Sequence, residues 1–516
     1  MSKGGHNPWA VAIVVTLAAF MEVLDTTIVN VSLPHMAGSL SVSNDDATWA
    51  LTTYLVANSV VLTISGSLSR LIGRKRFFLI CIGIFTIASF GCGVSTSFPE
   101  LLLFRAIQGF FGGGLQPLQQ AIILDVFPPE SRSRAFSLTA LAIIVAPVLG
   151  PLAGGWLTDT YSWHLIFLIN VPVGLITFFG VMHFVEDSEE IKREQANAPP
   201  FDYIGTIFIF LALGCLQIGM DRGEDYDWFG SMFIRVTLGI SFLSFLFGCL
   251  YLLYTRHPAV DLRVLKDRNF AFGFVQIGIV GLTLYSSSVL IPQFTQQQLG
   301  YTSMLAGLVL APGAVVLMFL IPMVGLAMNY LSPKMLIVLG GAALAASLFY
   351  SMDLVPDDSF DHLVILRATQ TIGLAFLFVP ISTVAYFTLP NSKQGDAAAL
   401  FSMSRNIFGG IGISIATAIV TERAQVHQTY LVDHLLPSPG YDSLLARLEQ
   451  AYQNHGVPAV ATASQAIKQV YQMLQTQEAV LAYIDVFWYT GLLALVLIPT
   501  ALLMHSGAGQ HKASGK

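Results

Sequence analysis

The sequence predicts an all-α polytopic membrane protein. Hydrophobic residues make up 54% of the 516 positions and charged residues only 11%, whereas soluble domains carry about 25% charged residues. The mean hydropathy is +0.67, and the apolar residues gather in runs of about 20, the length that crosses a bilayer as a helix. This composition excludes a soluble enzyme, a nucleic-acid-binding protein and a disordered chain.

Fourteen apolar runs are long enough to be transmembrane helices. We expect the first, which starts at Trp9, to be a retained span rather than a signal peptide. The expected spans are 9–33, 48–69, 77–95, 100–122, 135–157, 164–184, 203–220, 232–254, 270–293, 304–328, 334–352, 362–387, 397–420 and 485–505. The loops and tails on one side hold about seventeen Lys and Arg against four on the other, so the positive-inside rule predicts that both termini are cytoplasmic.

An internal repeat predicts two bundles. Arg105 and Gln108 match Arg367 and Gln370, each pair as Arg-x-x-Gln in an apolar run. This match indicates two six-helix halves separated by two inserted helices, a 6 + 2 + 6 arrangement. The predicted domains are an N-terminal six-helix bundle (1–184), a cytoplasmic connector (185–202), two inserted helices with a loop (203–269), and a C-terminal six-helix bundle (270–516) with an external loop (421–484).

The predicted external loop is unusually long. Its segments LLARLEQAYQ and AIKQVYQMLQ have the spacing of amphipathic helices, and loops of this length are usually functional. The alternative is a disordered external loop.

Two acids lie inside the first expected span, where a charged group costs about 3 kcal/mol. Glu22 and Asp25 are three residues apart, so both carboxyl groups share one helix face. A carboxyl group in a low-dielectric cavity beside another acid is readily protonated, and we expect the pair to carry protons. The alternative is that Asp25 pairs permanently with an arginine and only holds helices together, while Glu22 faces headgroups or water.

A polar stripe runs along the expected span 100–122. At about 100° per residue, Arg105, Gln108, Gln116 and Gln119 fall within about 80° of one another, so the stripe should face the bundle interior. The glycines 112–114 lie midway and allow a backbone or a ligand to approach closely. The stripe is expected to line a translocation path, or alternatively to form a hydrogen-bonded seam between helices.

Two glycine-containing segments are candidate gating elements. The expected span 135–157 contains two prolines four residues apart among three glycines, which favours a hinge or, alternatively, a bent structural helix; these residues are Pro147, Gly150, Pro151, Gly154 and Gly155. The loop after the second expected span, GSLSRLIGRKR, places Gly66 and Gly73 among four cations that include Arg74.

Enzymatic chemistry is not expected. The four cysteines lie in apolar runs, the histidines have no metal-like spacing, and no phosphate-binding glycine motif or nucleophile constellation occurs. We therefore predict no catalytic residues, no metal site and no cofactor.

Several longer motifs resemble the major facilitator superfamily, in particular its fourteen-span drug:proton antiporter branch and the EmrB-type multidrug exporters of Gram-negative bacteria. The resemblance covers nearly the whole chain. The motifs are LDTTIVNVSLP (24–34), RAIQG (105–109), APVLGPLAGG (146–155), WHLIFLINVPVG (163–174), DRGEDYDWF (221–229) and DLRVLKDRNF (261–270).

The resemblance implies the major facilitator fold and export by H⁺ antiport with alternating access, driven by the proton-motive force. Asp25 then matches the acid of the first span, Arg105 matches the arginine associated with proton coupling, and the motif 146–155 is linked to antiport and to limiting leak. The side chains expected to line an amphiphilic substrate cavity are Tyr54, Asn58, Gln108, Gln116, Gln119, Tyr285, Gln293, Arg367 and Gln370.

The expected cargo is an amphiphilic drug or toxic compound, with protons as the coupling ion. The alternatives are a dedicated exporter of one metabolite, such as a siderophore or a fatty acid, on the same scaffold, a proton-coupled importer, or a membrane enzyme. The resemblance also implies a multi-pass protein of the bacterial inner membrane that works with a periplasmic adaptor (membrane fusion) protein and an outer-membrane channel and binds no nucleic acid. The segment 421–484 is a candidate docking element for the adaptor.

The chain departs from the family pattern at one position of the cationic loop. Arg70 stands where the family carries an acid, and Leu71 replaces a customary arginine. Asp125 and Glu130 are the candidates to supply the missing carboxylate to the basic cluster.

Overall fold

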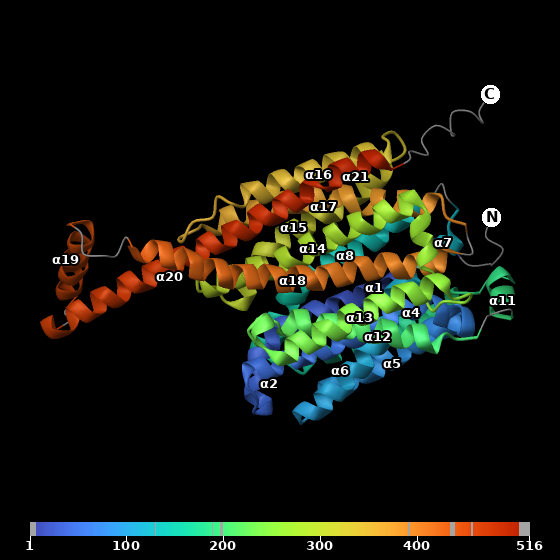
Figure 1. The fold of residues 1–516 in the computed structure, drawn as a ribbon, viewed down its shortest axis with the longest axis horizontal. Helices are drawn as coiled ribbons and strands as arrows, with labels where there is room; N and C mark the ends of the chain where they lie inside the picture. The colour runs from blue at the N-terminus through green and yellow to red at the C-terminus, as the bar shows by residue number, and fades with distance from the viewer. Residues whose placement is uncertain are drawn as a thin grey trace.

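The computed structural model describes residues 7–128, 131–187, 189–196, 200–390, 393–433, 439–455 and 458–504. Within these ranges every regular element is a helix and no strand occurs, which confirms the predicted all-α class. The helices run roughly along one axis and form an elongated bundle (Figure 1).

The N-terminal helices are α1 to α10. Asn7 caps α1 by accepting a hydrogen bond from the Trp9 amide, and Gly73, with φ +95°, makes the tight turn that joins α4 to α5. Their bounds are α1 Pro8–Ile28, α2 Leu33–Leu40, α3 Asn44–Ala47, α4 Trp49–Ile72, α5 Arg74–Val94, α6 Phe98–Gly112, α7 Leu115–Val126, α8 Arg132–Thr160, α9 Leu165–Leu168 and α10 Asn170–Phe184.

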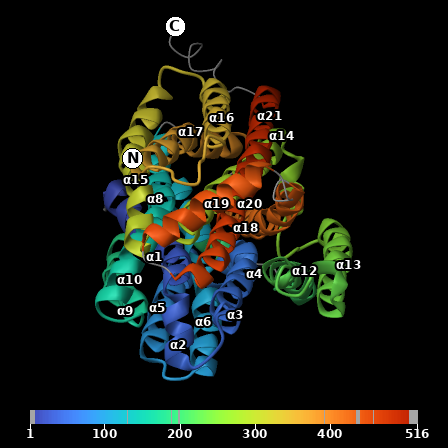
Figure 2. The same cartoon turned by 90° about the vertical axis from the view of Figure 1, so that its left-hand side faces the viewer.

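Three helices follow before the second large group. The short α11 (Glu189–Ala196) precedes α12 (Tyr203–Arg222) and α13 (Met232–Tyr254). Figure 2 shows α12 and α13 side by side on one flank of the bundle, where α12 packs against α13, α4 and α18. Much of the α13 surface is exposed, since only six of its 23 residues are buried.

The C-terminal helices pack against the N-terminal ones along α8 and α15 and along α4, α7 and α18. Tyr386 of α17 links the two groups, because its hydroxyl donates to Gln120 Oε1 at 2.9 Å and its ring stacks on Phe136 at 5.8 Å. The bounds are α14 Arg268–Gln297, α15 Ser303–Ala327, α16 Pro333–Tyr350, α17 Phe360–Phe387, α18 Gln394–Val432, α19 Pro439–Asn454, α20 Ala459–Leu495 and α21 Leu497–Leu503.

The predicted external loop 421–484 is largely helical. Helices α18 and α20 have 39 and 37 residues, which makes each about 55–60 Å long, nearly twice the ~30 Å hydrocarbon core. Figure 1 shows their far ends and α19 beyond the rest of the bundle, at the opposite end to α7, α11 and α21. The amphipathic helices predicted in this segment are thus present, as α19 and the first part of α20.

Twelve helices in the described part of the chain are long and apolar enough to cross a membrane, or thirteen if the two halves of α8 form one span. These halves, Arg132–Pro147 and Leu149–Thr160, meet at 42°, next to the two prolines that weaken the helical ladder. The expected span 100–122 is instead divided into α6 and α7 at Gly113 and Gly114. A side chain at Gly113 would collide with the Asn58 carbonyl of α4, so close helix packing explains why glycine interrupts the helix there.

Candidate functional site

Asp25 lies at the centre of a buried hydrogen-bond network. Its side chain is 0% exposed, and Arg105 Nη1 approaches its Oδ2 to 2.6 Å. Gln108 Nε2 and Asn170 Nδ2 each donate to Asp25 Oδ1 at 2.8 Å. Helices α6 and α10 therefore both bind α1 through this one carboxylate.

The Arg105 guanidinium is held on several sides. Its Nε donates to the Ala50 carbonyl at 3.0 Å and its Nη1 to Gln108 Oε1 at 2.8 Å. The Tyr54 ring lies 4.2 Å from the guanidinium carbon, a cation–π contact, while the Tyr54 hydroxyl has no hydrogen-bond partner among the described residues. The predicted juxtaposition of Asp25 and Arg105 is present in the structure.

Glu22 forms a second network one turn away on the same face of α1. Its side chain is 1% exposed, so it does not face headgroups or water. Asn58 of α4 donates to Glu22 Oε1 at 2.9 Å, and Gln116 of α7 donates to Oε2. Arg405 of α18 is close enough to interact with Glu22 electrostatically, which brings a charge from the C-terminal helices to this acid.

The whole polar stripe predicted for the span 100–122 is buried. Gln119 donates to Thr139 Oγ1 at 2.7 Å and to Thr16 Oγ1 at 3.3 Å. The stripe thus makes hydrogen bonds between helices in this conformation, while the Oε1 atoms of Gln116 and Gln119 have no partner among the described residues.

The second Arg-x-x-Gln pair forms a network that repeats part of the first. Arg367 Nη1 donates to Gln370 Oε1 at 3.2 Å, and Gln370 Nε2 donates to Ser351 Oγ at 2.8 Å. In the N-terminal helices Gln108 likewise donates to Ser89 Oγ, at 3.0 Å.

A single sequence offset relates the members of the two networks. Four residues of the first network lie 262 positions before their counterparts in the second; the pairs are Arg105 and Arg367, Gln108 and Gln370, Ser89 and Ser351, and Asp25 and Ser287. Arg367 donates to Ser287 at 2.7 Å and to Ser288 at 3.0 Å. A serine therefore occupies the position of the acid in the second network.

The remaining predicted cavity residues lie on α14. Tyr285 is half-buried and packs against Gly409 of α18, where any larger residue would collide with its ring. Gln293 is half-buried as well and takes part in none of the networks described above.

The cationic loop after α4 meets the start of α18. Arg70 Nη1 lies 2.6 Å from Asp396 Oδ1, and a side chain at Gly66 would come within 2.9 Å of the same oxygen. Arg74 pairs with Asp125, one of the two acids proposed for the cluster, and Glu130 lies outside the described residues. Arg70 and Asp396 thus form an ion pair whose acid comes from α18.

The glycine–proline segment of α8 packs on α1. Side chains at Gly150 and Gly154 would collide with Thr27 and Ile28, and Gly155 is buried nearby. Pro147 and Pro151 lie within the helix at its bend. The segment therefore combines a bend with close contact to the helix that holds Asp25.

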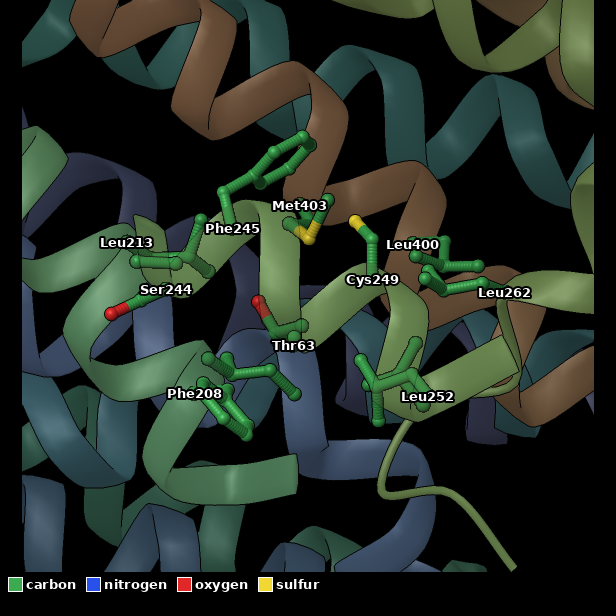
Figure 3. Close-up of a pocket in the computed structure, with 14 residues that line it drawn as sticks. Thr63, Phe208, Leu213, Ser244, Phe245, Cys249, Leu252, Leu262, Leu400 and Met403 are labelled. Atoms are coloured by element: carbon green, nitrogen blue, oxygen red, sulfur yellow. The ribbon is translucent and has the colours of Figure 1, made fainter. Parts of the chain in front are cut away.

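An apolar pocket lies on the flank of the bundle, between α12, α13, α4 and α18 (Figure 3). Its volume is about 70 Å³, and side chains such as Phe208, Phe245, Cys249 and Met403 line it. None of the predicted cavity residues contributes to this pocket. Among the described residues, no group of His, Cys, Asp and Glu side chains could hold a metal ion.

Three charged or amide residues of these networks were missed from the sequence, along with the serines and threonines that they contact. Arg405 is a lone cation in the expected span 397–420, and the rule that selected Arg105 would have found it. Asn170 lies in one of the family motifs, but its type alone does not indicate a contact with Asp25. Asp396 lies at the edge of an apolar run, where an acid usually faces water.

A family model of the Major Facilitator Superfamily matches residues 15–413. The fatty acid resistance protein FarB of Neisseria gonorrhoeae is 33% identical over 518 residues, which cover 99% of both chains. The multidrug export protein EmrB of Escherichia coli (strain K12) is 32% identical over 488 residues, 94% of this chain and 93% of that one.

A solved structure supports the fold alone. The proton:xylose symporter XylE, at 15% identity, gives a TM-score of 0.60 and covers 96% of this chain and 94% of that one. Together with the family match and the sequence relatives, this agreement confirms the resemblance found in the motifs. The chain belongs to the Major Facilitator Superfamily and is a multi-pass membrane transporter of the EmrB type.

Proposed function

We propose that this protein exports small amphiphilic compounds by H⁺ antiport and alternating access, driven by the proton-motive force. The observation that supports the proposal best is Asp25, a fully buried acid that receives hydrogen bonds from Arg105, Gln108 and Asn170. An ionisable residue inside a membrane span is a candidate for proton transfer.

Protonation of Asp25 offers a direct link between the proton and helix packing. A proton on Asp25 removes the charge that Arg105 needs, and breaking a buried ion pair costs about 3–5 kcal/mol. This energy is large enough to shift a transporter between two packing arrangements whose free energies differ by a few kcal/mol. Release of the proton on the other side of the membrane restores the ion pair and the first arrangement.

Alternating access needs contacts that open and close at the membrane surfaces. The Arg70–Asp396 ion pair joins α4 to α18, and the bent, glycine-containing part of α8 packs on α1 beside Asp25. We assign the first contact to a gate between the two bundles and the second to a hinge within the N-terminal bundle.

The proposed membrane organisation keeps fourteen spans in a 6 + 2 + 6 order, with α6 and α7 together as one broken span. Its domains are the bundle 1–184, the connector 185–202, the inserted helices 203–269 and the bundle 270–516. Both termini are cytoplasmic in the bacterial inner membrane. The helical segment 421–484, which lies at the opposite end to α11 (Figure 1), docks a periplasmic adaptor that leads to an outer-membrane channel.

The names of the relatives suggest two candidate cargo classes, chemically diverse drugs and fatty acids. One relative is named a multidrug export protein and another a fatty acid resistance protein. A broad exporter would move chemically unrelated amphiphiles, whereas a dedicated exporter would move one class such as fatty acids.

Everted membrane vesicles from an efflux-deficient strain test the proposal. With an acidic lumen, the wild-type protein should accumulate cargo while protons leave, and Asp25→Asn should abolish both fluxes while the protein remains folded. Asp353→Asn, which removes an exposed acid, is the matched control and should transport normally. Wild-type fluxes in the Asp25→Asn vesicles would refute proton coupling through this residue, and cargo release on acidification would indicate an importer.

A further inference from the structure

Arg405 differs from Arg105 and Arg367 because neither of its terminal nitrogens has a hydrogen-bond partner among the described residues. The side chain is 0% exposed. Its Nε donates to the neighbouring Asn406 Oδ1 at 3.3 Å, and the guanidinium also interacts with the Tyr285 hydroxyl of α14. A buried guanidinium with two free donor groups is costly unless a ligand or another group pairs with it.

The comparison with Arg105 and Arg367 sharpens this point. Arg105 pairs with Asp25, and Arg367 donates to two serines and a glutamine. The offset of 262 residues that relates the two networks also relates the starts of α8 and α18. At this offset, the N-terminal position equivalent to Arg405 is Ile143. Arg405 is therefore a charge added to one half of the repeat.

The surroundings of Arg405 combine one acid with aromatic rings. Glu22 of α1, Tyr285 of α14 and Tyr386 of α17 are close enough to interact with the guanidinium electrostatically, and the Phe378 ring lies 5.7 Å from its central carbon. Glu22 is already hydrogen-bonded to Asn58 and Gln116 and forms no ion pair with Arg405 within the described contacts. The guanidinium thus lies where α1 of the N-terminal helices meets α14, α17 and α18, and aromatic side chains lie beside it.

We propose that Arg405 binds the carboxylate of an amphiphilic anion, and that such anions are a cargo class of this transporter. The planar guanidinium presents two parallel N–H groups that match the two oxygens of a carboxylate. The neighbouring aromatic rings suit the apolar part of the same molecule. That such anions are transported rests on the proposed export function. Binding of the anion at Arg405 does not depend on proton coupling.

Equilibrium binding without a proton gradient tests the site separately from transport. Octanoate, octanol and octyltrimethylammonium have the same chain length and differ in their head group. Titration calorimetry on the full-length protein in phosphatidylcholine nanodiscs, with empty nanodiscs subtracted, should give tighter binding of octanoate than of octanol to the wild-type protein. Equal affinities for these two probes would overturn the proposal, even if proton-driven transport were intact.

Variants of Arg405 then test whether this side chain causes the preference for octanoate over octanol. Arg405→Gln should weaken octanoate binding by about tenfold to a hundredfold, the range expected for charge-assisted hydrogen bonds, and leave octanol binding unchanged. Arg405→Lys keeps the charge and should retain part of the preference. Arg235→Gln removes an exposed cation of α13 and should bind like the wild type.

Two outcomes of the variant series would refute the assignment. One is an unchanged ratio of octanoate to octanol affinity in folded Arg405→Gln protein. The other is an equal loss of both probes in Arg405→Gln and Arg405→Lys, which would mean that the arginine only maintains the packing around Glu22. If Arg405→Gln does not fold, the comparison of probes on the wild-type and Arg405→Lys proteins still decides the question.

Discussion

Arg70 at the end of α4 and Asp396 at the start of α18 form an ion pair of 2.6 Å between residues that are 326 positions apart. The pair is partly buried, with 23% of the Arg70 side chain and 8% of the Asp396 side chain exposed. The acid of this contact therefore lies on the C-terminal helices, and the arginine takes the position where the family pattern has an acid.

Exchange of the two charges tests this contact. Asp396→Asn should lower transport and thermal stability, because Arg70 loses its partner. The double exchange, Arg70→Asp with Asp396→Arg, should recover part of both, with a coupling energy of about 0.5–3 kcal/mol in a double-mutant cycle. Additive effects of the two single exchanges would show that the contact has no energetic role.

Asn170→Ala should weaken the Asp25 network without removing its acid. The substitution deletes hydrogen bonds to Asp25 Oδ1 and Ser89 Oγ, at 2.8 and 3.1 Å. A hydrogen bond to a charged group contributes about 1.5–3 kcal/mol, so transport in everted vesicles should fall by at least about tenfold. Asn329→Ala, at an exposed position, is the control; equal rates in the two variants would contradict a role for Asn170.

Gly109→Ala should separate α6 from α4. A side chain there would collide with the Tyr54 carbonyl, and overpacking of this kind costs about 1–3 kcal/mol. Thermal unfolding in detergent should occur at a lower temperature, and transport should fall with it. Gly239→Ala is the matched control, since nothing lies within 4 Å of the added atom, and it should leave stability unchanged or raise it slightly.

Asp485→Asn should loosen the base of the projecting helices. Asp485 Oδ2 accepts from Arg423 Nε at 2.5 Å and pairs with His427 Nε2 at 2.8 Å, which joins α20 to α18. Because the groups are partly exposed, each pair contributes about 1 kcal/mol or less, so loss of both pairs should make limited proteolysis up to about thirtyfold faster. Asp442→Asn on α19 should be cut at the wild-type rate, and a similar rate for Asp485→Asn would exclude the stabilising role.

The helices and the intramembrane charges were predictable because the bilayer sets their physical requirements. A span needs about 20 apolar residues, and a charged side chain inside it needs a partner, so Asp25 and Arg105 could be recognised from single residues. The division at Gly113 and Gly114 was not predicted, since it depends on how closely α6 approaches α4.

Contacts between residues far apart in the sequence could not be predicted, because they depend on how the helices pack. Asp396 could have faced water, and only the packing of α4 on α18 brings Arg70 to it. The Arg-x-x-Gln match indicated a repeat, but only the structure shows that Ser287 takes the place of Asp25 beside the second arginine. The continuity of α18 through residue 432 was also not predicted, because its outer part, TERAQVHQTYLV, is polar rather than apolar.

The unbroken α18 connects events at opposite ends of the molecule. Asp396 lies in its first turn, Arg405 further along, and Arg423 and His427 in its outer part. A rod of about 59 Å that tilts by about 5° moves its far end by roughly 5 Å. In the proposed transport cycle, a small rotation of α18 near Arg70 would therefore displace the projecting tip, where the proposed adaptor docks.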